Sequence, residues 1–242
     1  MNDLEKYFTQ NTGRSIHKLQ HYFDVYDRHF SRFRGTDVHV VEFGVDDGGS
    51  LQMWKDYFGP ECRIFGIDIN PYCKDLEEDR VSIYIGDQED RTFLRSLTAD
   101  IPRIDILIDD GGHRMQQQIN TFEEMFPCIE SNGVYLCEDL HTSYWKGWGG
   151  GGYRKKGTFI EYSKNFIDYI NAWHSQTPRL EVTQFTRSAR SLHFYDSVLV
   201  IEKGAVGEPV NLRTGTPTIK QYQAPPRKLR RLKSRLKSLF GQ

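Results

Sequence analysis

Short apolar runs recur along the first 140 residues, and stretches with helical spacing separate them. The runs predict five strands, at residues 38–43, 63–67, 81–85, 106–108 and 133–137. Apolar residues three and four apart predict helices between them, for example through Leu51, Trp54 and Phe58. This alternation is typical of an α/β protein with one doubly wound, mostly parallel sheet.

Both flanks of the predicted sheet carry further elements. The aromatic and aliphatic residues of 16–33 have the spacing of an amphipathic helix that packs on the sheet. Residues 158–173 predict another helix, with Phe159, Tyr162, Phe166, Ile170 and Trp173 facing inward. Residues 180–185 and 191–202 predict a closing antiparallel hairpin, which raises the sheet to seven strands.

The predicted elements divide the chain into four parts. Residues 1–35 form an N-terminal helical segment, and 36–204 form the main α/β domain. Residues 205–226, rich in proline and poor in apolar side chains, form a linker. Residues 227–242 form a basic amphipathic helix.

Charge is distributed unevenly along the chain. The formal net charge is -1, and seven Lys and Arg residues lie within 227–237, so residues 1–226 alone carry about -8. We expect a cytoplasmic protein, because no apolar run approaches the roughly 20 residues of a membrane span and the N-terminus does not resemble a signal peptide. Cys62, Cys73, Cys128 and Cys137 show no CxxC spacing and are expected to be reduced.

Acidic residues follow two successive strands where these strands end. Asp109, Asp110 and His113 follow the fourth strand, and Glu138 and Asp139 follow the fifth. Neighbouring strands lie about 4.8 Å apart, so carboxylates from both ends could share one cation. Acids from both strand ends with a histidine beside them suggest a hard divalent metal and a base.

A glycine-rich turn follows the first strand and precedes a helix, at residues 44–50. Such a turn brings backbone N–H groups close to a ligand. It lacks the GxGxxG spacing of dinucleotide sites. Glu42, two residues before Gly44, resembles instead the acid-then-glycine motif of class I S-adenosylmethionine-dependent methyltransferases. The cofactor candidates are Glu42, Gly44, Gly48, Ser50, Asp68, Asp87, Gln88 and Asp109.

Three of these candidates have defined expected roles. Asp68, at the end of the second strand and twenty residues after Gly48, suits the two ribose hydroxyls of an adenosine. Asp87 and Gln88 could hold the adenine edge or form a plain turn.

Weaker substrate candidates lie outside the strand ends: Lys18, His21, Tyr22, His141, Tyr144 and Trp145. Residues 149–152 are four consecutive glycines and form either a mobile lid or a flexible surface loop. Arg154, Lys155 and Lys156 suggest a phosphate-bearing acceptor or a solvated charge cluster.

The chain resembles the metal-dependent sugar O-methyltransferases of macrolide biosynthesis, the mycinamicin and macrocin type, and the related cephalosporin-hydroxylase-like group. The resemblance rests on residues 108–113 (IDDGGH), 121–122 (TF), 126–127 (FP) and 135–145 (YLCEDLHTSYW). It implies a Rossmann-like class I methyltransferase fold. It also implies Mg²⁺ ligands at Asp110, Glu138 and Asp139, and a general base at His113.

Together these features predict an O-methyltransferase that uses S-adenosylmethionine and Mg²⁺ and acts on a sugar hydroxyl. The acceptor would be a glycan, a nucleotide sugar, a lipid-linked intermediate or a glycosylated natural product. A nicotinamide oxidoreductase is disfavoured by the missing GxGxxG. A non-catalytic glycan- or nucleotide-binding module remains an alternative. A cephalosporin-hydroxylase-like enzyme is disfavoured because no 2-His-1-carboxylate iron spacing is recognisable in the sequence.

The C-terminal segment suggests a second binding partner. Leu229, Leu232, Leu236, Leu239 and Phe240 share one face of the helix predicted at 227–240, and basic residues surround them. This pattern suits peripheral attachment to an anionic membrane surface at the cytoplasmic leaflet. Alternatively, the leucine face docks on the protein itself or on a second subunit of a homo-oligomer. Nucleic-acid binding is disfavoured, because the rest of the chain is acidic.

Overall fold

The computed structural model describes residues 1–220 and 222. Residues 1–208 form one compact unit, and the described residues from 209 onward belong to a second one. The helix predicted at 227–240 lies outside the described residues. Within the described part of the chain, none of the helices combines the length and the hydropathy that a membrane crossing requires.

A seven-stranded sheet forms the centre of residues 1–208, in the order β3-β2-β1-β4-β5-β7-β6. The first five strands run parallel and are β1 (His39–Phe43), β2 (Arg63–Asp68), β3 (Val81–Ile85), β4 (Ile106–Asp109) and β5 (Val134–Cys137). The antiparallel strands β6 (Ala189–Tyr195) and β7 (Val198–Lys203) complete the sheet beside β5. The predicted fold class is therefore confirmed.

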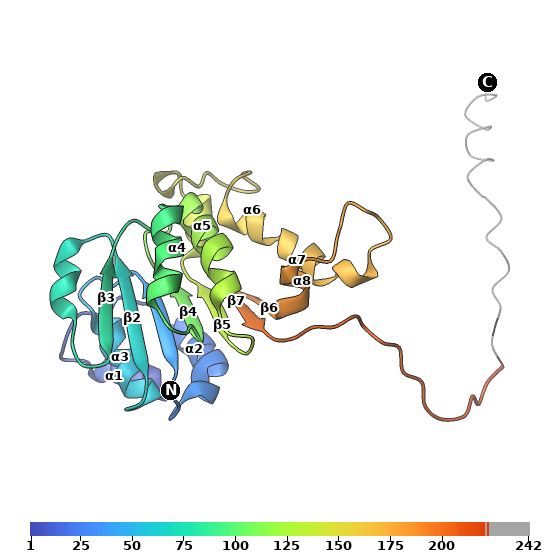
Figure 1. Cartoon of the computed structure of the whole chain (residues 1–242), viewed down its shortest axis with the longest axis horizontal. Coiled ribbons are helices and arrows are strands. Elements are labelled where there is room, and N and C mark those ends of the chain that lie inside the picture. The colour runs from blue at the N-terminus through green and yellow to red at the C-terminus, as the bar shows by residue number, and fades with distance from the viewer. Residues whose placement is uncertain (221, 223–242) are drawn as a thin grey trace, which may run out of the picture. The chain divides into compact units, whose positions relative to one another are not determined.

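Helices cover both faces of the sheet (Figure 1). One face carries α1 (Asp3–Gln10), α2 (Tyr22–Phe30) and α3 (Gly49–Phe58). The other carries α4 (Arg91–Asp100), α5 (Met115–Met125), α6 (Phe159–Ser163) and α7 (Asn165–Ile170).

Side chains of the buried strands alternate between these two layers. Val40 packs toward α1–α3 and Val41 packs toward α4–α7, and both are fully buried. Each such aliphatic side chain contributes about 1.5–3 kcal/mol through its burial. The loops at the strand ends are thereby held on a rigid support.

The N-terminal segment differs from its prediction. The helical spacing of 16–33 holds only from Tyr22, where α2 begins, and residues 11–21 are not helical. Asn11 forms a turn at the start of this non-helical segment, where its Oδ1 accepts from the Gly13 N–H at 2.9 Å and its Nδ2 donates to the Arg14 carbonyl at 2.8 Å. The non-helical segment passes directly beside the strand ends.

The helix predicted at 158–173 is broken into α6, α7 and a short 3₁₀ turn at Ala172–His174. Asn165 and Asn171 donate from their side chains to the carbonyls of Tyr162 and Ile167, at 2.9 and 2.8 Å. Such bonds compete with a continuous helix. Phe159 and Phe166 are buried as predicted.

The closing hairpin is confirmed, but its predicted strands were wrong. Residues 180–183 form no strand, and α8 (Gln184–Ser188) follows them, stabilised by a capping box between Thr183 and Thr186. Both strands of the hairpin lie within 189–203, and the chain reverses between Tyr195 and Val198. Ser197 adopts the left-handed conformation there, with φ of 63°.

Candidate active site

A cavity of about 390 Å³ lies at the carboxyl ends of the parallel strands. The loops that follow β1, β2, β3 and β4 line it, at residues 43–46, 67–70, 86–88 and 110–113. The non-helical residues 15–18 complete its wall. In doubly wound sheets, ligands bind at this edge, so the cavity occupies the place that the sequence predicted.

The glycine turn brings three segments into close contact. Gly44 has a φ of 89°, and a Cβ there would lie 2.1 Å from the Asp110 carbonyl oxygen. A Cβ at Gly49 would lie 2.1 Å from the Ser15 carbonyl oxygen. Gly44 and Ser50 line the cavity, whereas Gly48 faces away and caps α3 in the left-handed conformation. Glycine is required at positions 44 and 49 because the backbone of another segment lies too close to leave room for a Cβ atom.

We expect Gly44→Ala to cost about 1–3 kcal/mol of stability and to reduce ligand binding, since the new methyl group would displace the loop that carries Asp110. Gly147→Ala is the matched control, because nothing lies within 4 Å of a Cβ there. Urea unfolding monitored by circular dichroism measures both. Equal unfolding midpoints for the two variants would show that the close approach at Gly44 is unimportant.

Asp68 joins the glycine turn to the end of β2. Its Oδ2 accepts from the backbone N–H groups of Val45 and Asp46, at 2.8 and 3.2 Å, and its Oδ1 accepts from the Asn70 N–H at 2.8 Å. Asp87 lines the cavity as well, and its Oδ1 accepts from the Glu89 N–H at 2.8 Å. Both predicted cofactor residues are therefore at the cavity wall, where backbone N–H groups of the glycine turn and of its own loop hold Asp68, and one of its own loop holds Asp87.

Gln88 and Asp109 form a buried pair at the ends of β3 and β4. Gln88 donates to Asp109 Oδ1 at 2.5 Å and to the Thr121 hydroxyl at 2.9 Å, and its Oε1 accepts from the Gly112 N–H at 3.2 Å. Burial raises the pKa of Asp109 to about 7. Gln88 lines the cavity but Asp109 does not. Asp109 therefore holds Gln88 in position, and its contact with a cofactor stays a prediction.

Glu42 also lies behind the cavity wall. It is fully buried, and its Oε2 accepts from the Ser50 hydroxyl at 2.9 Å. Burial raises the pKa of Glu42 to about 7, although Lys18 opposes this. Its position supports a role in holding Ser50 and Lys18 in place of the predicted direct cofactor contact.

Lys18 lies inside the predicted acidic cluster. Its ammonium forms ion pairs with Asp110, with Glu138 at 3.1 Å and with Glu42 at 3.8 Å, and its side chain is only 3% exposed. Burial alone would lower the pKa of Lys18, but these carboxylates outweigh it and raise the pKa above its usual value. The side chain thus carries a positive charge between the ends of β4 and β5. From the sequence, Lys18 was predicted only as a weak substrate candidate over the site. Its ion pairs with the acidic residues were not predicted.

Two tyrosines of α2 contact the acids that follow β5. Tyr26 donates to Glu138 Oε1 at 2.6 Å, and Tyr22 donates to Asp139 Oδ1 at 2.7 Å. Burial raises the pKa of Glu138 well above its usual value. Tyr22 was predicted as a substrate contact, and Tyr26 only as a core residue of the aromatic stripe. Both hydroxyls orient carboxylates in the structure.

His113 faces the acids from the loop after β4, with φ of 52°. Its Nε2 lies 3.4 Å from Asp139 Oδ2 and 3.9 Å from Asp110 Oδ1. Ligand atoms of Asp110, His113 and Asp139 lie within 4.8 Å of one another. Among residues 1–220 and 222, the buried Nδ1 of His113 has no hydrogen-bond partner. The strand ends therefore bring together the histidine and the acids that the sequence named, with Glu138 deeper, beside Lys18.

The remaining substrate candidates lie to one side of the main cavity. His141 Nδ1 is 2.5 Å from the Ser197 hydroxyl and 4.0 Å from Asp139 Oδ1. His141 and Tyr144 line a second cavity of about 390 Å³. Trp145 is 49% exposed and packs edge-on against His141. His21 contacts the Asp196 carbonyl at 2.9 Å and lines neither cavity.

The glycine-rich segment is attached to the loop after β5. The Gly150 and Gly151 N–H groups donate to the carbonyls of Trp145 and Ser143, both at 3.1 Å. A Cβ at Gly150 would lie 2.3 Å from the Thr142 carbonyl oxygen. This close approach explains a glycine at position 150. Whether the segment moves as a lid stays a prediction.

No family model matches the chain. Comparison with individual proteins gives relatives that agree with one another in the reaction that their names describe. A tetracenomycin rhamnosyl 3'-O-methyltransferase of Streptomyces olivaceus is 37% identical over 201 residues, covering 78% of this chain and 51% of its own length. Mycinamicin VI 2''-O-methyltransferase of Micromonospora griseorubida is 35% identical over 212 residues, with 82% and 51% covered.

A solved structure agrees with these sequence relatives. The mycinamycin-pathway methyltransferase MycE, described in complex with Mg, SAH (S-adenosylhomocysteine) and mycinamycin VI, superposes with a TM-score of 0.77 at 32% identity. The match covers 84% of this chain and 54% of that one. This chain spans about half the length of the relatives it matches. It is therefore a homologue of the sugar O-methyltransferases of the mycinamicin and tetracenomycin type and has the Rossmann-like fold of class I methyltransferases.

Proposed function

We propose that this chain is an O-methyltransferase that uses S-adenosylmethionine and Mg²⁺ to methylate a hydroxyl group of a sugar. The observation that carries this proposal is the position of His113, Asp110 and Asp139 at one end of the strand-edge cavity. The relatives with 32–37% identity support it, since their names describe methyl transfer to sugar-bearing compounds. MycE supports the choice of cofactors, because it is described with Mg and SAH.

The cavity fits a nucleoside-type cofactor. Its volume of about 390 Å³ falls within the usual range for ligand sites. Asp68 and Asp87 offer carboxylate oxygens at the wall for ribose and adenine donors. The glycine turn admits the cofactor close to the backbone.

The acidic cluster fits Mg²⁺, which prefers oxygen ligands. Asp110 and Asp139 would hold the ion, with Glu138 beside them where it now contacts Lys18. Bound Mg²⁺ would orient an acceptor hydroxyl and lower its pKa. Tyr22 donates one hydrogen bond to Asp139 and Tyr26 donates one to Glu138, which orients both carboxylates. Each bond occupies only one lone pair of its carboxylate.

His113 would act as the general base. Its Nε2 points toward the acids and its side chain is 19% exposed, so an acceptor hydroxyl could reach it. Asp139, at 3.4 Å, would stabilise the imidazolium that forms when the proton is taken. The methyl group is already activated as a sulfonium substituent, so alignment of the nucleophile is the remaining requirement.

The sugar of the acceptor is proposed to bind near His141 and Tyr144. Both residues line the second cavity, and His141 Nδ1 lies 4.0 Å from Asp139 Oδ1. A glycosylated natural product is favoured by the relatives, which are named for rhamnosyl tetracenomycins and mycinamicin. Polysaccharide, nucleotide-sugar and lipid-linked acceptors, and membrane attachment through residues 227–240, remain narrower proposals that rest on the sequence pattern.

Lys18→Met should lower the melting temperature in EDTA. It should also increase the rise in melting temperature that Mg²⁺ causes. Without the ammonium, the carboxylates at the ends of β4 and β5 repel each other until a cation binds. Lys6→Met is the control, because Lys6 is a half-exposed surface residue. Thermal unfolding with and without 10 equivalents of Mg²⁺ measures the effect. Identical Mg²⁺-induced shifts in Lys18→Met and wild type would contradict the charge-balancing role.

Calorimetric titration with S-adenosylmethionine, NAD and Mg²⁺ tests the proposed class. We expect S-adenosylmethionine to bind and NAD not to bind. NAD binding alone would favour an oxidoreductase, which would overturn the proposal. Cofactor binding without any methyl transfer to sugars would favour a non-catalytic module.

A further inference from the structure

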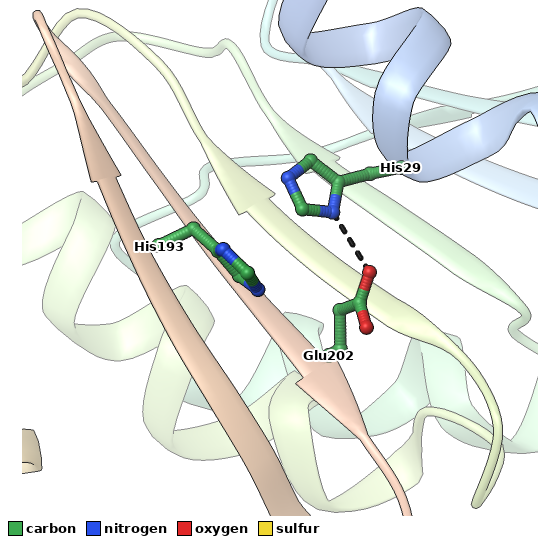
Figure 2. A group of neighbouring side chains, drawn as sticks. All are labelled: His29, His193 and Glu202. Atoms are coloured by element: carbon green, nitrogen blue, oxygen red, sulfur yellow. Dashed lines mark hydrogen bonds and ion pairs between the residues drawn. The ribbon is translucent and has the colours of Figure 1, made fainter.

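Two histidines and a glutamate lie close together on one face of the sheet. They form a group distinct from the acidic cluster at the ends of β4 and β5. His29 comes from the last turn of α2, His193 from β6 and Glu202 from β7 (Figure 2). One ligand atom from each lies within 4.8 Å of the other two. The sequence showed no 2-His-1-carboxylate spacing, because the three residues are separated by 164 and 9 positions and only the fold unites them.

The backbone holds the three side chains on rigid elements. β7 pairs with both β5 and β6, and Ser191 pairs with Glu202 in the register, so His193 lies diagonally across from Glu202 on the same face. α2 covers this face, and His29 is only 2% exposed. The His29 and His193 rings lie 4.6 Å apart between centroids.

Neighbouring groups fit a metal-bound state. His29 Nδ1 lies 2.8 Å from Glu202 Oε1, and His29 Nε2 lies 2.9 Å from the Tyr195 hydroxyl. When Nδ1 coordinates a metal, Nε2 carries the proton and donates to Tyr195, so the imidazole stays neutral and its tautomer is held. Arg32 contacts Glu202 at 3.2 Å and keeps that carboxylate ionised and oriented.

We propose that His29, His193 and Glu202 form a structural site for a transition-metal ion of the Zn²⁺ type, which ties α2 to the β6–β7 hairpin. Two imidazoles and one carboxylate are a known Zn²⁺ ligand set; it leaves the fourth position to water, the open arrangement otherwise found in catalytic sites. Tetrahedral Zn²⁺ spaces its ligand atoms about 3.3 Å apart. The three candidate ligand atoms, within 4.8 Å of one another, lie somewhat farther apart than this spacing (Figure 2). The three residues line none of the described cavities, which favours a structural role over catalysis.

Zinc titration in the presence of saturating Mg²⁺ and S-adenosylhomocysteine tests this site apart from the acidic cluster. We expect wild type to bind one Zn²⁺ by calorimetry and to gain thermal stability. His193→Ala should weaken this binding by more than about tenfold. His193 is the chosen variant because it is partly exposed and its loss leaves the hydrogen bond between His29 and Glu202 in place.

A control variant and a spectroscopic measurement complete the test. His174→Ala is the control for histidine loss, because His174 is exposed and lies outside the cluster. Co²⁺ substitution should give the visible absorption of a four-coordinate site in wild type and in His174→Ala, but not in His193→Ala or Glu202→Gln. Equal Zn²⁺ affinity in wild type and His193→Ala, or no Zn²⁺ binding by wild type, would overturn the proposal.

Discussion

His113→Ala is expected to lower kcat by about 10²–10⁴-fold and to leave the affinity for S-adenosylmethionine nearly unchanged. The expected size is that of a lost general base. Cofactor binding should survive because the loops after β1, β2 and β3 supply most of the cavity wall. Single-turnover methyl transfer measures the chemical step, and calorimetry measures the affinity.

His174→Ala is the matched control, since it removes an exposed histidine away from the cavity. The base assignment also predicts that the rate of His113→Ala rises with pH, as hydroxide or an ionised acceptor replaces the missing base. A His113→Ala enzyme with wild-type kcat would refute the assignment. A weakened cofactor affinity with unchanged kcat would identify His113 as a binding residue.

Asp110→Asn is expected to abolish Mg²⁺-dependent turnover and to weaken Mg²⁺ binding by more than about 100-fold. Asn keeps the shape of the side chain but removes the charge that Mg²⁺ requires. Asp110 is also an ion-pair partner of Lys18, so the freed ammonium would stay beside Glu138 and oppose a divalent ion. Calorimetric titration with Mg²⁺, with and without cofactor, measures the loss.

Asp79→Asn serves as the control, because Asp79 is 91% exposed. The affinity of Asp110→Asn for S-adenosylmethionine should stay within a few-fold of wild type. Mg²⁺ affinity equal to wild type would exclude Asp110 as a ligand. Asp68→Asn should show the opposite pattern, with weakened cofactor binding and retained Mg²⁺ binding.

The strand-end residues could be predicted from the sequence because two local rules determine them. Apolar runs identify β4 and β5, and a parallel sheet places the residues after both strands at one edge. Asp110, His113 and Asp139 meet there as expected. The five parallel strands were predictable for the same reason, since each has its own apolar run, whereas β6 and β7 share the single run predicted at 191–202.

Contacts between distant segments could not be read from local patterns. The aromatic spacing of α2 identified a packed helix, but not that Tyr22 and Tyr26 direct hydroxyls at acids more than 100 positions away. Lys18 reaches Asp110 because residues 11–21 are not helical and pass beside the strand ends, which the helical spacing of 16–33 did not indicate. Likewise, nothing near His29 in the sequence points to His193 or Glu202.

Transfer of a labelled methyl group from S-adenosylmethionine is the most direct test of the proposed function. The acceptors would be an α-L-rhamnosyl tetracenomycin, a panel of nucleotide sugars and a set of lipid-linked glycans, each assayed with Mg²⁺ and with EDTA. We predict label on a sugar hydroxyl of at least one acceptor in Mg²⁺, loss of transfer in EDTA, and recovery when Mg²⁺ is restored. Transfer at the full rate in EDTA, or absence of label from every sugar acceptor while the protein binds the cofactor, would contradict it.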